Sequence, residues 1–208
     1  MYNRYVVVGM VQTNCYIVAA DDSETCVIID PGDHPGRIIN AVNESGRKPA
    51  AILLTHGHFD HITAVPELLK EYGDSIKVYA SVSERELLAS TELNCSSVVD
   101  RPVAVSADIY VNDGDTIEEA GLKFKVIATP GHTIGSVCYY VEAESVLFSG
   151  DTLFEMSVGR TDLPTGSSAA IEQSIKNKLY VLPDYVTVYP GHGADTNIAF
   201  EKNNNMYV

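Results

Sequence analysis

Three short segments of this chain carry five of its six histidines, and each segment directly follows an apolar run. The segments are Thr55-His56-Gly57-His58-Phe59-Asp60-His61, Thr129-Pro130-Gly131-His132-Thr133 and Tyr189-Pro190-Gly191-His192-Gly193. Apolar runs of this length are typical of buried strands, and sheet proteins usually place their reactive groups where strands end. The pattern therefore predicts a sheet protein in which several strand ends gather histidines at one site.

The first segment has a spacing that suits a metal. Alternate residues of an extended chain point to the same side, so His56, His58 and Asp60 are expected to face one cavity. His61 needs a turn to join them, and Gly57 is expected to let the backbone pass close to a metal. Imidazole and carboxylate groups are good ligands for zinc, iron or manganese.

Further along the chain, Asp151 follows the apolar run 146–148 in the same way. A chance arrangement of polar loops would have to explain three histidine turns and this carboxylate together, so a metal site is the stronger interpretation. The sixth histidine, His34, lies outside the three segments and is expected to be an exposed turn residue. Asp30 is expected either to support a metal ligand from behind or only to form a turn.

The hydrophobic pattern indicates an α/β chain folded as one domain over residues 1–208. Strands are expected at residues 5–8, 15–19, 25–29, 51–54, 77–80, 122–128, 136–141, 145–149 and 187–189. Helices are expected around residues 38–42, 65–72 and 83–90 and from about residue 168. Residues 91–107 look irregular, and the polar tail 202–205 is expected to be frayed.

Composition excludes several classes of protein. The formal net charge of −14 disfavours nucleic-acid binding, which rests largely on Lys and Arg contacts to phosphate. No run of eighteen apolar residues predicts a membrane span, and the N-terminus does not look like a signal peptide, so a cytoplasmic protein is expected. The four cysteines form no C-x-x-C pair, and we expect reduced, mostly buried thiols that bind no metal.

The chain resembles the metallo-β-lactamase superfamily over essentially its whole length. The resemblance rests on the motif T-H-x-H-x-D-H at residues 55–61, followed in order by His132, Asp151 and His192. The resemblance implies an αββα four-layer sandwich, in which two mixed β-sheets are flanked by helices. It also implies two divalent metal ions per chain, with zinc expected first and iron or manganese compatible. By this resemblance His56, His58 and His132 hold the first metal, Asp60, His61 and His192 hold the second, and Asp151 bridges them together with a hydroxide.

Residues 150–162 look like the glyoxalase II, or hydroxyacylglutathione hydrolase, group, in which a basic residue at the place of Arg160 helps hold the glutathione end of the substrate. True β-lactamases of the superfamily commonly have Cys or Ser where this chain has Asp151. Two tyrosines of full-length glyoxalase II correspond to Asp162 and Ala194 here, and only a short stretch follows His192. The short, single-domain members are therefore the better match. They imply a thioester hydrolase with Asp60 and Asp151 as catalytic carboxylates and a small-molecule partner.

Three alternatives stay open. The segment Gly159-Arg160-Thr161-Asp162 also resembles persulfide dioxygenases, which use one iron that His56, His132 and Asp151 would hold here. A phosphodiesterase, nuclease or lactonase uses the same fold, although the acidic charge disfavours a nuclease. A non-catalytic metal-binding module is the weakest alternative, because every ligand position is filled.

Overall fold

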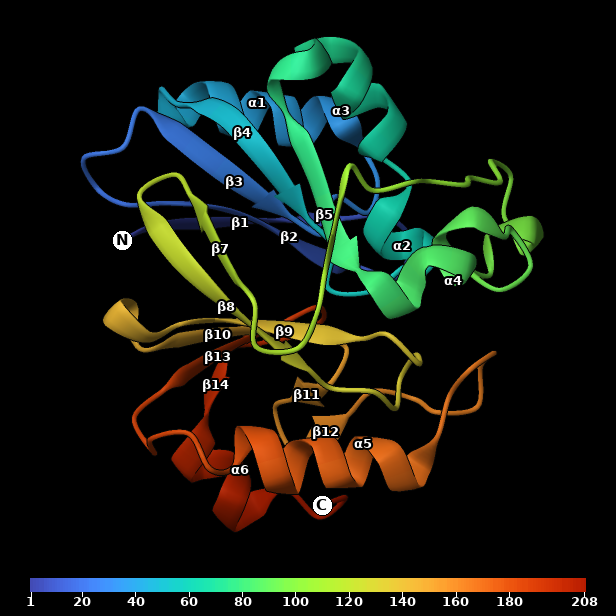
Figure 1. The fold of residues 1–208 in the computed structure, drawn as a ribbon, viewed down its shortest axis with the longest axis vertical. Helices are drawn as coiled ribbons and strands as arrows, with labels where there is room; N and C mark the ends of the chain where they lie inside the picture. The colour runs from blue at the N-terminus through green and yellow to red at the C-terminus, as the bar shows by residue number, and fades with distance from the viewer.

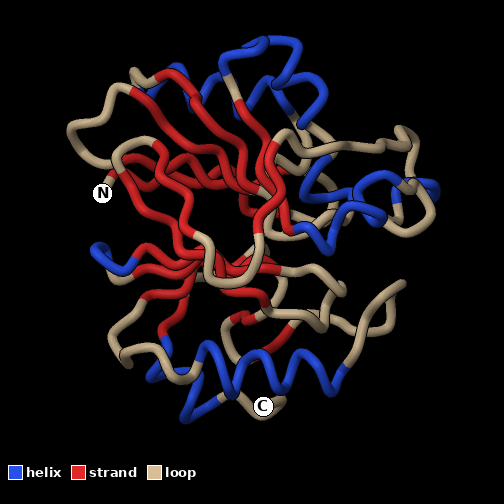
Figure 2. The backbone as a smooth tube through the Cα atoms, in the orientation of Figure 1, coloured by secondary structure: helices blue, strands red, loops and turns tan.

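The structure is a computed structural model that describes residues 1–208, apart from the side chain of residue 74. Two six-stranded sheets face each other, and helices cover the outer face of each sheet (Figures 1 and 2). The four layers run helix, sheet, sheet, helix from the top to the bottom of Figure 1. The αββα sandwich expected from the sequence is therefore confirmed.

The first sheet has its strands in chain order. They are β1 (Tyr2–Val8), β2 (Thr13–Ala19), β3 (Thr25–Ile29), β4 (Lys48–Leu53), β5 (Lys77–Ser81) and β6 (Ile109–Val111). The first three strands are antiparallel and the last four parallel, so the sheet is mixed. Ile29 at the end of β3 lies beside Leu53 at the end of β4. The segments that follow these two strands therefore leave the sheet at the same edge.

The second sheet has the order β14-β13-β10-β9-β8-β7. Its strands are β7 (Thr116–Glu119), β8 (Leu122–Ala128), β9 (Val137–Val141), β10 (Val146–Gly150), β13 (Thr187–Pro190) and β14 (Thr196–Asn197). β9 runs antiparallel to both β8 and β10, while β10 and β13 are parallel. Strands β8, β10 and β13 thus end on one edge, and each leads into a segment that carries a His or an Asp. A two-stranded ribbon of β11 (Leu153–Phe154) and β12 (Ser157–Val158) follows β10.

The helices that flank the first sheet are α1 (Pro35–Ser45), α2 (Phe59–Ile62), α3 (Val65–Tyr72) and α4 (Arg85–Ala89). Beneath the second sheet lie α5 (Ser168–Ser174), the π-helix η5 (Ile175–Leu179) and α6 (Ile198–Asn204). Short 3-10 turns are η1 (Gly73–Ser75), η2 (Val82–Glu84), η3 (Ser96–Val98) and η4 (Glu142–Glu144). None of the helices formed by the described residues has the length and apolar character needed for a membrane span.

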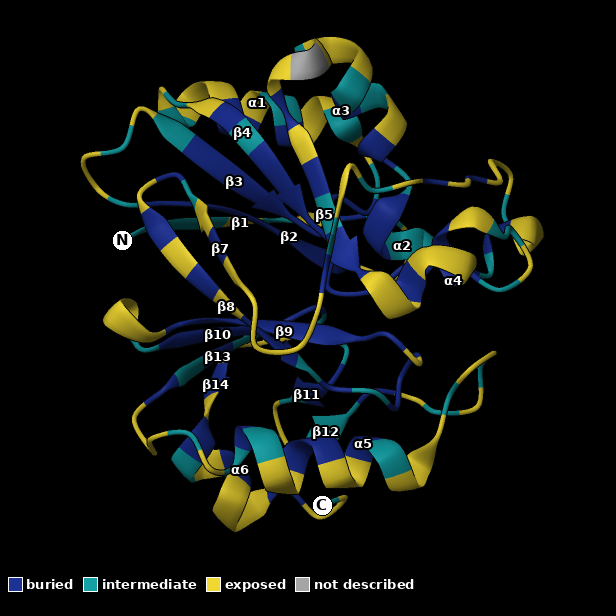
Figure 3. Cartoon of the chain, viewed as in Figure 1, coloured by how far each residue is buried: buried dark blue, intermediate teal, exposed yellow. Residues whose placement is uncertain are grey.

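Two apolar clusters hold the layers together, and Figure 3 shows the strands in the middle of the molecule as mostly buried. The larger cluster joins the two sheets to each other and the first sheet to α1 and α3, and the smaller one joins the second sheet to α5, η5 and α6. Tyr139 of β9 is fully buried, and its hydroxyl donates a 2.7 Å hydrogen bond to the carbonyl of Leu54. The amide of Val137 donates to the carbonyl of Thr55 over 2.8 Å. Strand β9 of the second sheet is therefore hydrogen-bonded to the two residues that join β4 to His56.

The sequence-based expectations failed most clearly at the tail, residues 202–205. Its residues extend helix α6, because the side chain of Asn197 accepts a hydrogen bond from the amide of Phe200 and caps the helix. The carboxylate of Glu201 is fully buried and accepts hydrogen bonds from Thr196 and Asn205. These tertiary contacts order a polar segment that has no apolar periodicity. The short strands β6, β7, β11, β12 and β14 were also not predicted.

Candidate metal centre

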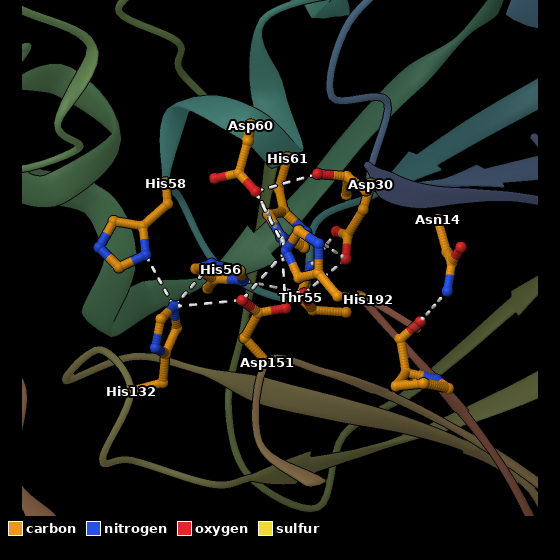
Figure 4. Close-up of polar contacts among 12 residues, drawn as sticks. Asn14, Asp30, Thr55, His56, His58, Asp60, His61, His132, Asp151 and His192 are labelled. Carbon is orange, nitrogen blue, oxygen red and sulfur yellow. Dashed lines mark hydrogen bonds and ion pairs between the residues drawn. The ribbon is translucent and has the colours of Figure 1, made fainter. Parts of the chain in front are cut away.

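Four strands of the two sheets, β4, β8, β10 and β13, deliver the predicted metal ligands to one place, at the edge where the sheets meet. His56 and His58 follow β4, Asp60 and His61 lie in α2, and His132 lies in the turn between β8 and β9. Asp151 directly follows β10, and His192 follows β13. Figure 4 shows these seven side chains pointing toward one another. The structure therefore brings together every residue that the sequence predicted as a metal ligand.

One group consists of the three histidines that the resemblance assigned to the first metal. Nδ1 of His58 lies 2.8 Å from Nε2 of His132, which in turn lies 3.2 Å from Nε2 of His56. All three side chains are buried. Three ring nitrogens thus converge on one point.

A second group consists of Asp60, His61 and His192. Nε2 of His61 lies 3.3 Å from Oδ2 of Asp60 and 3.3 Å from Nε2 of His192. Nε2 of His192 lies 3.2 Å from the same Asp60 oxygen. The hydroxyl of Thr13 donates a 2.9 Å hydrogen bond to this oxygen and fixes the carboxylate in place.

The carboxylate of Asp151 lies between the two groups. Its Oδ1 is 3.3 Å from Nε2 of His61, and its Oδ2 is 3.6 Å from Nε2 of His132 and 3.4 Å from Nε2 of His192. It is thus close to both sets of ligand atoms, as a bridging ligand would be. A side chain on Gly191 would have no room here, since a Cβ would lie 2.2 Å from Oδ1 of Asp151.

The outer nitrogens of the histidine rings explain why the inner ones can act as ligands. Nδ1 of His132 lies 2.7 Å from the carbonyl oxygen of Arg160, and Nδ1 of His192 lies 3.1 Å from that of Val11. A carbonyl only accepts hydrogen bonds, so each of these Nδ1 atoms carries the proton. In the neutral ring the lone pair then sits on Nε2 and faces the centre, which is the arrangement of a histidine metal ligand.

The pKa shifts of the histidines indicate that the carboxylates of the centre attract positive charge. Burial lowers the pKa of His56 well below its usual value and that of His58 to about 3, so both rings are neutral. Burial opposes charge on His61 and His192, but the nearby carboxylates of Asp60 and Asp151 have a larger, opposite effect. The pKa of His61 is therefore raised well above its usual value, and that of His192 is raised to about 9. Positive charge is therefore required between the carboxylates, and protons meet the requirement where no metal is bound.

The donor set fits a pair of metal ions. Three ring nitrogens that meet at 2.8 and 3.2 Å around one point are placed to share a cation. Tetrahedral zinc with bonds of about 2.0–2.1 Å holds its ligand atoms about 3.3 Å apart, close to the distances found here. Moreover, Oδ1 of Asp151 is buried without a hydrogen-bond partner among the described residues. A buried oxygen without a partner is costly, and a metal would satisfy it.

One detail of the sequence-based reasoning was wrong, and a second residue has a role that the sequence did not indicate. The extended alternation holds for His56 and His58, but the chain turns into α2 at Phe59, so the helix and not the alternation turns Asp60 toward the centre. The structure shows a different reason for Gly57. A Cβ there would lie 2.7 Å from the side chain of Leu87, so this glycine makes room for α4.

Asp30 supports a metal ligand from behind, which is one of the two roles expected for it. Its carboxylate accepts hydrogen bonds from the amide and hydroxyl of Thr55, at 2.8 and 2.6 Å, and its Oδ2 lies 3.0 Å from Nδ1 of His61. His34 lies outside the centre, half exposed, and its Nδ1 accepts a hydrogen bond from the amide of Gly9. None of the four cysteines belongs to a metal-ligating group among the described residues, although Cys95 lines the cavity beside the centre.

Three residues of β2 support the centre and were not singled out from the sequence. The side-chain amide of Asn14 donates to the carbonyls of Pro190 and Gly193, and the hydroxyl of Tyr16 donates to the carbonyl of Pro190. Together with Thr13 they fasten the turn that carries His192 to the first sheet. The run Thr13-Asn14 at a strand start is a weak signal, because polar residues there usually only begin a strand.

The centre opens into a cavity of about 410 Å³. Its wall includes Arg160 on the segment after β12 and the apolar side chains of Val11, Phe154 and Leu163. The side chain of Arg160 is 62% exposed, and its guanidinium donates two hydrogen bonds, of 2.7 and 2.8 Å, to the carboxylate of Asp162. Arg160 therefore lies at the cavity mouth and is already paired with an exposed acid.

Comparisons with known sequences agree with this geometry. The model of the "Metallo-beta-lactamase superfamily" matches residues 8–192. The probable metallo-hydrolase YqgX of Bacillus subtilis is 37% identical, over 99% of this chain and 96% of the relative. The hydroxyacylglutathione hydrolase GloC of Haemophilus influenzae is 32% identical, over 95% of this chain and 93% of the relative.

Solved structures agree as well. The structure of BLEG-1, described as a B3 metallo-beta-lactamase, is 40% identical, covers 99% of both chains and superposes with a TM-score of 0.92. The structure of TTHA1623 in a di-iron-bound form is 33% identical, with a TM-score of 0.87 over 99% of this chain and 100% of that one.

Proposed function

The chain belongs to the metallo-beta-lactamase superfamily, and from this premise we propose that it is a hydrolase with two metal ions that cleaves thioesters such as S-lactoylglutathione. His56, His58 and His132 hold one ion, and Asp60, His61 and His192 hold the other. Asp151 is shared between them. Zinc is the first choice, with iron or manganese also suited to these ligands.

The position of Asp151 is the observation that carries the proposal. Its two carboxylate oxygens lie within 3.3–3.6 Å of three histidine nitrogens, which come from both groups of ligands. A single metal would need three or four of the seven side chains and would leave buried donors unused. The di-iron form of the relative TTHA1623 supports two ions, and it keeps iron beside zinc as a candidate.

The chemistry follows from the ligands and the substrate. When bound, two metals supply a nucleophilic water at neutral pH and polarise a carbonyl oxygen. The histidines and carboxylates that line the cavity all belong to the ligand set. A thiol leaves as a thiolate, because its pKa is about 8.5, whereas an amine leaving group requires a proton donor. Cleavage of a thioester therefore needs no separate proton donor from these side chains, whereas cleavage of an amide does.

Arg160 is the proposed contact for an anionic end of the substrate. Its guanidinium lines the cavity mouth, and its backbone carbonyl accepts the Nδ1 proton of His132, so the segment is held next to the centre. A carboxylate of the thiol carrier would share the guanidinium with Asp162 or displace it. The relative GloC, named as a hydroxyacylglutathione hydrolase, supports glutathione as the carrier.

The test combines metal analysis with hydrolysis assays. Protein purified without added metal is analysed for zinc, iron and manganese, and the same preparation is assayed on S-lactoylglutathione, on a neutral thioester, and on a β-lactam because of the similarity to BLEG-1. We expect about two metals per chain and faster turnover of the thioesters than of the β-lactam. A fully loaded, active protein with one metal would contradict the two-metal site, and preferential cleavage of the β-lactam would contradict the substrate.

A second candidate function is a persulfide dioxygenase with one iron. The ligand atoms of His56, His61 and Asp151 lie within 4.8 Å of one another, and His132 lies 3.2 Å from His56 and 3.6 Å from Asp151. Either set of two histidines and one carboxylate suits a non-haem iron that activates oxygen. Consumption of oxygen with a glutathione persulfide, by protein that holds one iron per chain, would favour this function over the hydrolase.

A further inference from the structure

Glu84 is a buried carboxylate that the proposed reaction does not use. It is the last residue of η2, directly after β5, and only 1% of it is exposed. Carboxylates are almost never fully buried unless they are paired or well hydrogen-bonded. No cation pairs with Glu84 among the described residues, so its hydrogen bonds must stabilise it.

All of these hydrogen bonds come from the two segments that carry the first group of histidines. Oε2 accepts a 2.8 Å hydrogen bond from the amide of Gly57, which lies between His56 and His58. Oε1 accepts hydrogen bonds of 2.8 Å from the hydroxyl of Thr133 and 2.8 Å from the amide of Gly135, just after His132. One oxygen thus binds one segment, and the other oxygen binds the other segment.

The packing around Glu84 reinforces this arrangement. A Cβ on Gly57 would lie 2.7 Å from Leu87 and 2.9 Å from Leu88, the two buried leucines of α4. A Cβ on Gly135 would lie 2.6 Å from the backbone nitrogen of Glu84. Both histidine segments therefore lie in close contact with the η2–α4 segment, and their distance from each other depends on it.

We propose that Glu84 is a positioning residue for the first metal: it bridges the His56–His58 segment and the His132 segment and so sets the distance between their ring nitrogens. His58 and His132 are 74 residues apart in the chain, yet their nitrogens meet at 2.8 Å. The carboxylate does not touch the metal ligands themselves and acts only through two backbone amides and the Thr133 hydroxyl of the segments that hold them. The inference rests on the metal-binding part of the proposed function and is independent of which substrate is cleaved.

The test is Glu84→Gln, which keeps the size of the side chain and removes one acceptor. Whichever segment meets the new NH₂ group faces a donor instead of an oxygen. The matched control is Glu201→Gln, because Glu201 is equally buried and also accepts from backbone and side-chain donors, in the C-terminal region. Thermal unfolding of all three proteins shows how much stability each substitution costs.

The measured quantity is the affinity of each of the two metal sites, from competition with a chelator and from the visible absorption of bound cobalt. His58→Ala and Asp60→Asn provide reference spectra for loss of the first and second site. We expect Glu84→Gln to weaken the first site about ten- to a hundredfold, to shift the cobalt spectrum toward that of His58→Ala, and to leave the second site unchanged. Glu201→Gln is expected to lose stability and to keep both affinities.

Unchanged affinity of the first site in folded Glu84→Gln overturns the proposal, and so does an equal loss in Glu201→Gln. If Glu84→Gln does not fold, Thr133→Ala removes one of the three hydrogen bonds and should cause a smaller loss at the first site; unchanged affinity there overturns the proposal as well. Wild-type protein that binds no cobalt would instead reject the metal centre itself, so the two failures are distinguishable.

Discussion

The carboxylate of Asp30 lies 3.0 Å from Nδ1 of His61, and both side chains are buried. The same carboxylate accepts two hydrogen bonds from Thr55, one of them from the backbone amide. It therefore orients the ring of His61 and keeps the proton on Nδ1, which leaves Nε2 free for a metal. Asp30 thus acts on the second group of ligands, on the side opposite the centre.

This relationship predicts that Asp30→Ala weakens metal binding at the second site. Without the carboxylate the ring of His61 loses its fixed orientation and tautomer, and such losses typically cost ten- to a hundredfold in metal affinity. Competition with a chelator measures the affinity. Asp33→Ala is the matched control, since Asp33 lies on the same turn but bonds to His34 and Arg101 instead. Equal metal affinity in wild type and Asp30→Ala would contradict this role.

Substitution of Asp151 should affect activity more than substitution of any exposed carboxylate. Because Asp151 is placed to contact both metals, we expect Asp151→Ala to fold and to lose at least roughly a hundredfold in kcat/KM on the best thioester. Glu155→Ala, an exposed carboxylate four residues later, should retain its activity. Near-normal turnover by folded Asp151→Ala would remove Asp151 from the centre.

His34 supplies the negative control for the ligand set. Its ring is half exposed and bonds to the amide of Gly9, away from the converging nitrogens. We expect His34→Ala to keep the metal content of the wild type, as measured by elemental analysis of the purified proteins. Loss of a metal equivalent would show that the ligand assignment is wrong.

Arg160→Ala tests the kind of substrate. If the guanidinium binds an anionic end of the substrate equally in the ground and transition states, its loss raises KM and leaves kcat nearly unchanged. A charge-assisted hydrogen bond of about 1.5–3 kcal/mol corresponds to a rise of roughly ten- to a hundredfold. Steady-state kinetics on S-lactoylglutathione measure the change, and the effect should shrink on a neutral thioester.

Arg101→Ala is the control for this experiment. Arg101 is also 62% exposed and paired with acids, but it lines a neighbouring cavity and not the one that holds Arg160. A similar rise in KM for both variants would point to long-range electrostatics, which added salt would screen. Equal KM values for Arg160→Ala and wild type would leave Arg160 as a surface residue paired with Asp162.

Much of the fold and the identity of the clustered residues could be predicted from the sequence, because both rest on local signals. The apolar runs before Thr55, Asp151 and Tyr189 are typical of buried strands, and a turn with glycine beside His or Asp follows each run. The prediction failed where the local signal was weak. Residues 202–205 have no apolar periodicity, and only the cap at Asn197 and the contacts of Glu201 make them helical.

The sequence by itself determined which side chains form the centre, since ligand type and strand-end position are properties of short segments. Only the tertiary structure decided how those side chains are held. Val11 fixes the tautomer of His192 from 181 residues away, Asn14 holds the His192 turn from 176 residues away, and Glu84 bonds to Gly57 and Gly135 at once. These contacts join segments that share no local pattern. They arise because two sheets pack face to face and bring the ends of distant strands to one edge, where each buried polar group must find its partner.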